Sequence, residues 1–554
     1  MADKRFEYLA LSHMWGTNHE NQIRLTTKRF SEFEQGIPWG KLTPTFRQAV
    51  QITSVLGYRY IWIDSLCIIQ ASPSDSNSDW EHEAQRMALV YGNCVANIAF
   101  LFPHDEIRKT REDPRTWSSC ILREASASQS GVYIRHLHES WHKSFLSREE
   151  AWLDQKQWPL FSRAWTFQEY LLSPRTLLYG HKNLMYQCSH VFYDELLGPI
   201  AEAKNKITDR TYTGRDLCKN RYFPPAISTI GNIDCLFAPA LLSFTSDWMN
   251  TINEYRTRKL TYPTDRTIAF AGIATAYRKL SGMTYLAGLW WEHFPLSLLW
   301  FVEHKTSAAV RDENPERFPR GVIPVYDTDI DEQGVSEAPT WSWFSVPIYR
   351  FFRASFLFND DERTVKGRSK REPRRCSFED LDSAEPVSFY FGACPPNVFP
   401  KSGYSDFHNL AVVLNALVWP VSRGISTGIA PQLHRIRALE NLGQLLQWDL
   451  GLTYYPDIPA IGEAPPPPRH TFFVLLVEFQ IIRTGGLYHV ERRLAGIVIT
   501  RTERPGHWKR VGAWKLKIKI KGVEVNEGCV DDVAKRWKKY RLTSDWTKEQ
   551  VTLF

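Results

Sequence analysis

A carboxylate on a predicted helix is the residue best suited to chemistry in this chain. Glu169 lies one turn past Trp165 in the segment RAWTFQEYLLSPR, residues 163–175. A carboxylate in a ligand crevice can orient a sugar hydroxyl and stabilise the oxocarbenium-like charge that develops in glycoside cleavage. Trp165 would then form a wall of the pocket. The same residues also fit a structural role, in which Glu169 pairs with Arg163 or Arg175 and Trp165 packs in the core.

Further candidate ligand-binding residues follow predicted strands. Ser12 ends the apolar run YLALS, and Asp64 follows the run YIWI. Parallel α/β sheets place their ligand sites at the carboxyl ends of strands. Asp64 has a structural alternative, because an aspartate here can cap a loop through backbone N–H groups. Two more candidates are Trp15, which follows the first strand, and Gln168, on the same predicted helix as Glu169.

The elements that must position these residues form a predicted α/β layered domain. Apolar runs predict strands, and the segments between them have the spacing of helices. Thr43 and Pro44 predict the start of one of these helices, with Thr43 as the N-cap and Pro44 at the first helical position. The order β-α-β-α-β implies parallel pairing with right-handed crossovers. The predicted strands are 8–12, 60–63, 95–100, 176–179 and 184–188, and the helix that carries Trp165, Gln168, Glu169 and Leu172 on one face is 160–172.

The length of 554 residues predicts two or three domains. We expect an α/β domain over 1–200 with an insertion at about 101–160, a helical and aromatic extension over 201–350, a basic linker or loop over 351–404, and a β-rich region over 405–554. The linker includes residues 363–375, with seven Lys or Arg, which we interpret as a solvated segment rather than a nuclear-import or nucleic-acid patch. In the β-rich region, the lysines from Lys515 to Lys521 alternate with apolar residues. This pattern favours a strand at a protected edge.

The composition narrows the class of protein. Hydrophobic residues make up 43% and charged residues 23%, as in globular proteins. The net charge of +7 is small for this length and gives no argument for nucleic-acid binding. The nine cysteines are scattered without a C-x-x-C pair, which favours reduced thiols in a cytoplasmic protein. We expect no secretory signal and no membrane span, because no run of about 18 apolar residues occurs.

Two short motifs offer rival chemistry. His138 and His142 fit the zinc-binding pattern H-E-x-x-H, with Glu139 as the base. They lie in the predicted insertion and no third ligand is specified, so a zinc hydrolase is a remote alternative and no cofactor is firmly predicted. Residues 424–428 fit G-x-S-x-G, but Pro431 follows and no Asp or His partner is identifiable, so we interpret the segment as a loop.

Several blocks of the sequence resemble the fungal heterokaryon incompatibility (HET) domain family. The combination of WIDSLCIIQ, then M-x-x-V-Y, then R-x-W-T-x-Q-E is specific in order and spacing. One departure is His13, where an aromatic residue is common in the family. The matching blocks are EYLALSHMWG (7–16), LTPTFRQAVQITSVLGYRYIWIDSLCIIQ (42–70), DWEHEAQRMALVYGNCVANIAF (79–100) and PLFSRAWTFQEYLLSPRTLLYG (159–180), with further similarity up to residue 346.

This resemblance implies a role in nonself recognition and regulated cell death. HET domains are distantly similar to TIR domains, some of which cleave NAD. In that comparison Trp165 and Glu169 lie like the W-C-x-x-E helix that carries the TIR catalytic glutamate, and NAD would be the substrate. Two mechanisms remain open: NAD hydrolysis through Glu169, or a non-enzymatic module that assembles with protein partners or with itself.

Overall fold

The chain folds into two compact units in the computed structural model. The first unit comprises residues 1–227 and 254–280, and the second comprises residues 228–253 and 281–554. The structure describes residues 6–14, 23–70, 78–103, 120–124, 126–134, 159–180, 184–195, 198–199, 202–205, 210–213, 239–256, 258–302, 338–346, 354–356, 375–391, 410–420, 447–456, 471–484, 489–521 and 547–554.

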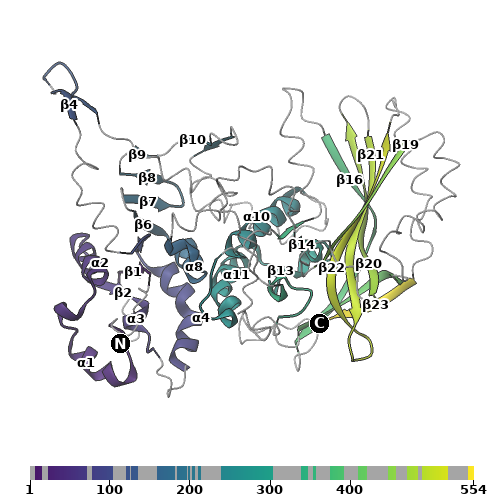
Figure 1. Cartoon of the computed structure of the whole chain (residues 1–554), viewed down its shortest axis with the longest axis horizontal. Helices are drawn as coiled ribbons and strands as arrows, with labels where there is room; N and C mark the ends of the chain where they lie inside the picture. The colour runs from purple at the N-terminus through teal and green to yellow at the C-terminus, as the bar shows by residue number, and fades with distance from the viewer. Residues whose placement is uncertain are drawn as a thin grey trace, which may run out of the picture. The chain divides into compact units, whose positions relative to one another are not determined.

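The first unit is built on a seven-stranded sheet (Figure 1). Its strands are β1 (Tyr8–Ser12), β2 (Tyr60–Trp62), β3 (Ala96–Phe100), β6 (Arg175–Tyr179), β7 (Leu184–Cys188), β8 (Phe192–Asp194) and β9 (Gly198–Pro199). They lie in the order β2-β1-β3-β6-β7-β8-β9. The pairs β1–β2, β1–β3 and β3–β6 are parallel, and the pairs from β6 to β9 are antiparallel. The chain leaves β1 for β2 on one side and then crosses to β3 on the other, so the strand order reverses between β1 and β3.

Helices cover both faces of this sheet. On one face, Phe46 and Ala49 of α2 (Pro44–Val55) join the core that contains Leu9 and Leu11. The other face of β1 packs against α4 (Ser78–Asn93), where Met87 and Tyr91 surround Ala10, and against α8 (Trp165–Leu172). Because neighbouring side chains of a strand point to opposite faces, Ser12 shares the face of Ala10.

The start of α2 follows local rules. The Thr43 side chain accepts a hydrogen bond from the Phe46 backbone N–H at 3.2 Å, and Pro44 occupies the first helical position. Proline suits this position because its missing N–H would have no partner inside the helix. The sequence prediction of this helix start is confirmed. The other helical elements of the first unit are η2 (Thr27–Arg29), α1 (Phe30–Gln35), η3 (Trp39–Lys41), α3 (Asp64–Cys67), η4 (Pro159–Ser162), η7 (Pro263–Arg266) and most of α11 (Ile268–Ser281), and short hairpins form from β4 (Cys120–Arg123) with β5 (Val132–Ile134) and from β10 (Glu202–Asn205) with β11 (Arg210–Thr213).

The second unit is rich in long antiparallel strands. They are β16 (Arg375–Ser383), β17 (Glu385–Phe391), β18 (Leu410–Pro420), β19 (Gln447–Pro456), β20 (Thr471–Thr484), β21 (His489–Arg501), β22 (His507–Lys521) and β23 (Thr547–Leu553). Pairing between β18 and β20 closes a ring of five strands through β21, β22 and β23. β22 pairs with β21 on one side and with β19 on the other. The expectation that the Lys515 to Lys521 strand forms an edge is therefore wrong.

An aromatic core belongs to the same unit. Five of the tryptophans that the structure describes are fully buried, namely Trp248, Trp290, Trp300, Trp341 and Trp343. The indole N–H groups of Trp248 and Trp343 both donate to the carbonyl oxygen of Gly288, at 2.9 and 3.0 Å. Gly288 has φ +89°, and a Cβ there would lie 2.2 Å from the Trp343 indole nitrogen, so this position requires glycine. The remaining elements near this core are α10 (Pro239–Arg256), β12 (Tyr285–Leu286), β13 (Leu289–Trp290), η8 (Trp291–His293), η9 (Leu296–Leu299), β14 (Trp300–Val302), η11 (Trp343–Ser345) and β15 (Ala354–Phe356).

The predicted mixed α/β class is confirmed in its main features, a partly parallel sheet near the N-terminus and a β-rich C-terminal region. Most of the predicted insertion, all but the last residue of the basic segment 363–375 and the loop 424–428 lie outside the described residues. The division into domains at residues 200, 350 and 404 stays a prediction. None of the helices in the described ranges is long and apolar enough to cross a membrane.

Candidate functional site

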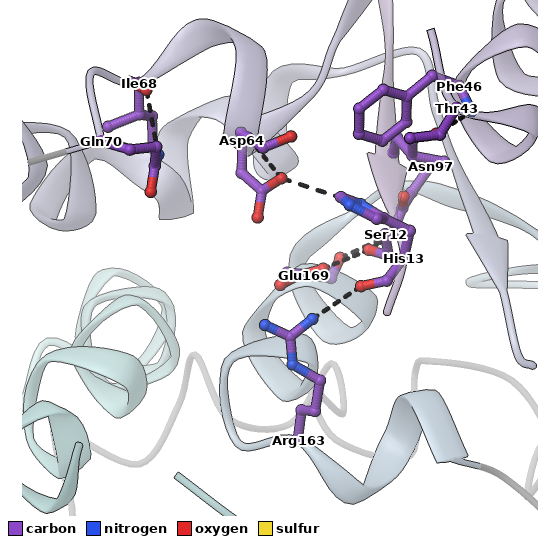
Figure 2. A network of polar contacts seen from close by, with 12 residues as sticks. Ser12, His13, Thr43, Phe46, Asp64, Ile68, Gln70, Asn97, Arg163 and Glu169 are labelled. Carbon is purple, nitrogen blue, oxygen red and sulfur yellow. Dashed lines mark hydrogen bonds and ion pairs between the residues drawn. The ribbon is translucent and has the colours of Figure 1, made fainter. Parts of the chain in front are cut away.

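A buried serine–glutamate pair lies at the carboxyl end of β1. The Ser12 hydroxyl donates to Glu169 Oε2 at 2.5 Å, and the two residues are 2% and 6% exposed (Figure 2). Ser12 is the last residue of β1, and Glu169 reaches it from α8, which packs on β1 and β3. Both residues were predicted as site candidates, and the structure brings them together.

The ends of α8 are fixed by hydroxyl groups that hold Glu169 in place. Thr166 Oγ1 donates to the carbonyl oxygens of Leu160 at 3.0 Å and Arg163 at 2.8 Å. At the other end, Ser173 Oγ donates to the carbonyl oxygen of Glu169 at 2.6 Å. These bonds satisfy backbone carbonyls at the two ends of the helix.

Two residues that the sequence analysis did not single out complete the cluster. Asn97, on β3, donates through Nδ2 to Ser12 Oγ at 2.9 Å and to the Glu169 carbonyl oxygen at 3.4 Å. Tyr91, on α4, donates to the Leu11 carbonyl oxygen at 3.0 Å and lies close enough to support the charged form of Glu169. An available signal was the single polar side chain of Asn97 in the otherwise apolar run VANIAF.

Burial and the groups around Glu169 together place the pKa of its carboxyl near neutrality. Burial raises the pKa of this carboxyl from 4.5 to about 7, because the charged form loses its hydration. The hydrogen bond from Ser12 and the positive charge of Arg163 act in the opposite direction, while the negative charge of Asp64 adds to the increase. Burial also raises the pKa of Tyr91, so that its phenol stays protonated beside Glu169. At neutral pH, Glu169 therefore exists in both its charged and its neutral form.

A second polar group lies beside this pair. His13 Nδ1 and Asp64 Oδ1 are 3.9 Å apart, and Arg163 Nη1 donates to the His13 carbonyl oxygen at 2.7 Å. Figure 2 shows the Asp64 carboxylate pointing toward the His13 ring. Burial lowers the pKa of His13 below 6.5 despite the opposing effect of Asp64, so the imidazole is mostly neutral at pH 7. Asp64 is 22% exposed and accepts from the Ser65 backbone N–H at 2.6 Å, as its structural interpretation expected.

The other candidates on α8 make their hydrogen bonds and close contacts with residues outside the Ser12–Glu169 pair. Trp165 Nε1 donates to Asp265 Oδ2 at 3.2 Å, and its ring packs edge-on against Trp80. Gln168 is 1% exposed and packs toward α11, where a Cβ on Gly272 would lie 2.6 Å from its Oε1. The arginines expected to pair with Glu169 make other contacts. Arg163 binds the His13 carbonyl, and Arg175 Nη1 donates to the Val95 carbonyl at 3.2 Å.

Three candidates cannot be placed, because Trp15, His138 and His142 lie outside the described residues. Within the part of the chain that the structure describes, no group of three or more His, Cys, Asp or Glu residues could hold a metal ion. The zinc alternative at His138 and His142 therefore stays a prediction.

Comparison with known families identifies the N-terminal region. Residues 8–169 match the family model described as Heterokaryon incompatibility protein (HET). This region is a HET domain. The matched segment begins at the first residue of β1 and ends at Glu169, so the HET domain contains every residue of the Ser12, Asn97 and Glu169 cluster. Neither the curated proteins nor the solved structures include a significant match to this chain.

Proposed function

We propose that this HET domain acts in fungal nonself recognition and regulated cell death, and that it does so by cleaving the N-glycosidic bond of NAD. Glu169 is the catalytic carboxylate. The observation that carries the proposal is a buried carboxylate, with a pKa raised to about 7, at the point where the strand order reverses. In open α/β sheets, ligands bind outside the carboxyl ends of the strands at such a reversal.

The reaction follows from the charge that develops at the sugar. The bond between the ribose C1′ and the nicotinamide nitrogen breaks, and its electron pair neutralises the pyridinium charge. The Glu169 carboxylate stabilises the positive charge left on C1′. Water adds to C1′ and loses one proton, which Glu169 accepts and passes to solvent. The products are ADP-ribose, nicotinamide and one proton.

This mechanism requires the ionised form of Glu169. Because the pKa is about 7, the value of kcat/KM should rise about tenfold per pH unit below pH 7 and level off above it. The test is nicotinamide release from NAD by the purified full chain. We expect Glu169→Gln to abolish release and Glu32→Gln, which alters an exposed carboxylate bonded to Lys41, to leave it unchanged.

The assignment has two distinct failures. If the protein releases nicotinamide and Glu169→Gln does so at the same rate, another residue is the catalytic one. If the unaltered protein releases none, even at high concentration, NAD cleavage is not its function.

A non-enzymatic assembly module is the second candidate function, and it is supported by apolar side chains at one edge of the sheet. β2 pairs with β1 alone among the described strands. Val55 is 86% exposed, Leu56 46% and Tyr60 41%, and the 50% exposed Phe6 packs edge-on against Tyr60. Exposed apolar groups of this kind favour self-association.

Sedimentation of the full chain tests this second candidate. Val55→Lys should dissociate an assembly that forms through this edge. Leu89→Lys is the matched control, because Leu89 is also an exposed apolar residue but lies on α4. A chain that sediments as a monomer at all concentrations, or an assembly that Val55→Lys leaves intact, contradicts the role of this edge.

A further inference from the structure

Asn97 contacts Glu169 by two routes. Its Nδ2 donates directly to the Glu169 carbonyl oxygen at 3.4 Å, and it donates to Ser12 Oγ at 2.9 Å. Ser12 in turn donates to the Glu169 carboxylate at 2.5 Å. Asn97 is 0% exposed, so these bonds form away from bulk water. One amide therefore connects the main chain of Glu169 with its side chain.

The orientation of this amide is fixed by its neighbours. The Glu169 carbonyl oxygen can only accept hydrogen bonds, and it already accepts one from Ser173 Oγ at 2.6 Å. A flipped amide would place Asn97 Oδ1 against that carbonyl, so that two acceptors would face each other. In the observed orientation, Oδ1 is buried and has no hydrogen-bond partner within the described part of the chain. The bonds made by Nδ2 therefore determine the orientation.

The Ser12 hydroxyl donates to Glu169 Oε2 and also interacts with the Tyr91 phenol, so its neighbours limit the directions that its hydrogen can take. A serine hydroxyl has one hydrogen and two lone pairs. The N–H of Asn97 occupies an acceptor position, so the hydrogen is free to point at Glu169 Oε2. Hydrogen bonds in such a chain strengthen one another, and a donor aimed at a carboxylate favours its charged form.

The other titratable and charged groups around Glu169 come from each neighbouring element. Tyr91 lies on α4, Asp64 follows β2, His13 follows β1, and Arg163 precedes α8. Asn97 carries no charge of its own. Its effect on Glu169 is therefore transmitted through the Ser12 hydroxyl and the α8 main chain.

We propose that Asn97 is a positioning residue, whose amide nitrogen directs the Ser12 hydrogen to Glu169 and so holds the carboxylate in one orientation. The catalytic consequence of this role rests on the proposed NAD cleavage. The hydrogen-bond chain itself does not, so the two can be tested separately.

The experiment measures the ionisation of Glu169 in the full chain. An infrared titration follows the carboxyl band that disappears in Glu169→Gln. In Asn97→Leu, which keeps the size of the side chain and removes its donors, we expect the Glu169 ionisation constant to fall about tenfold, which is one pKa unit. Asn97→Asp keeps the shape and places a second carboxylate against Ser12, so it should shift the titration further.

Thr53→Val is the matched control. Thr53 is buried on the opposite side of the sheet, in α2, and its hydroxyl donates to the Ala49 carbonyl at 2.8 Å. The control removes one buried hydrogen bond without touching Ser12 or Glu169, so the titration of Glu169 should stay unchanged.

Each outcome decides the inference. An unchanged Glu169 titration in folded Asn97→Leu overturns it. If Thr53→Val folds and both Asn97 variants do not, Asn97 is a structural residue and the inference is also wrong. With NAD as substrate at pH 6, Asn97→Leu should lower kcat about tenfold and leave KM unchanged. If the titration shifts but the unaltered protein releases no nicotinamide, the positioning role stands and the proposed function fails.

Discussion

Two buried titratable residues, one in each unit, show how the surroundings of a side chain decide whether it ionises near neutral pH. Glu169 in the first unit and His293 in the second are 6% and 2% exposed. Burial raises the pKa of Glu169 to about 7 and lowers the pKa of His293 to about 3. In both cases burial favours the neutral form, because the charged form loses its hydration.

The difference between them lies in their partners. Glu169 receives a hydrogen bond from Ser12 and feels the positive charge of Arg163, and both support its charged form. His293 Nδ1 shares a hydrogen bond with Thr245 at 3.1 Å, and its ring packs edge-on against Phe244. Its Nε2 has no hydrogen-bond partner among the described residues. His293 therefore stays neutral as a packing residue, whereas Glu169 remains able to exchange a proton at pH 7.

The largest effect that this comparison predicts is a loss of stability on ionising Glu169. The folded-state pKa lies above the unfolded value, so the folded protein binds the extra proton between about pH 4.5 and 7. This contribution to the free energy of unfolding is fully present at low pH and falls by about 3 kcal/mol as the pH rises through 7. Urea unfolding from pH 5 to 8 measures it, and Glu169→Gln should lose this fall. Equal pH profiles for the two proteins would mean that Glu169 is not a buried ionising group.

His293 should give a somewhat smaller effect of the opposite sign. Its folded-state pKa is depressed below 6.5, so the unfolded protein binds the extra proton as the pH falls. At pH 5 this costs about 2 kcal/mol of stability relative to pH 8. His293→Phe, which keeps an aromatic ring, should remove this loss. If that variant loses as much stability between pH 8 and pH 5 as the unaltered protein, other groups cause the loss.

The smallest predicted effect on stability distinguishes a hydroxyl that donates to a carboxylate from one that bonds only to backbone groups. Ser12→Ala removes the donor to Glu169, so its cost should grow with pH and reach about 1–2 kcal/mol at pH 8. Ser342, in the second unit, donates to the Ala287 carbonyl at 2.5 Å and accepts from the Phe344 N–H at 3.1 Å. Ser342→Ala should cost about the same at every pH. If the stability cost of the two variants depends on pH in the same way, the proposed difference between the two sites is wrong.

The sequence by itself determined the local elements of the first unit. β1 and β7 have the predicted bounds, and β2, β3 and β6 differ from theirs by one residue. α2 begins at the predicted Thr43 cap. These features follow from short apolar runs and from the chemistry of one proline and one threonine, which act over a few residues. Glu169 was selected by its position one turn past Trp165 and by the resemblance to the HET domain family.

The tertiary structure alone decided which side chains meet. Asn97 is 85 residues from Ser12 and 72 from Glu169, so no local pattern could join them. The predicted shared face of α8 divides, because the sheet takes Glu169 while α11 packs against Gln168. The alternating lysines of β22 identified a strand but not its neighbours, because β19 reaches it from a distant part of the chain. Strand pairing and helix rotation depend on contacts between remote segments, and a one-dimensional pattern does not contain them.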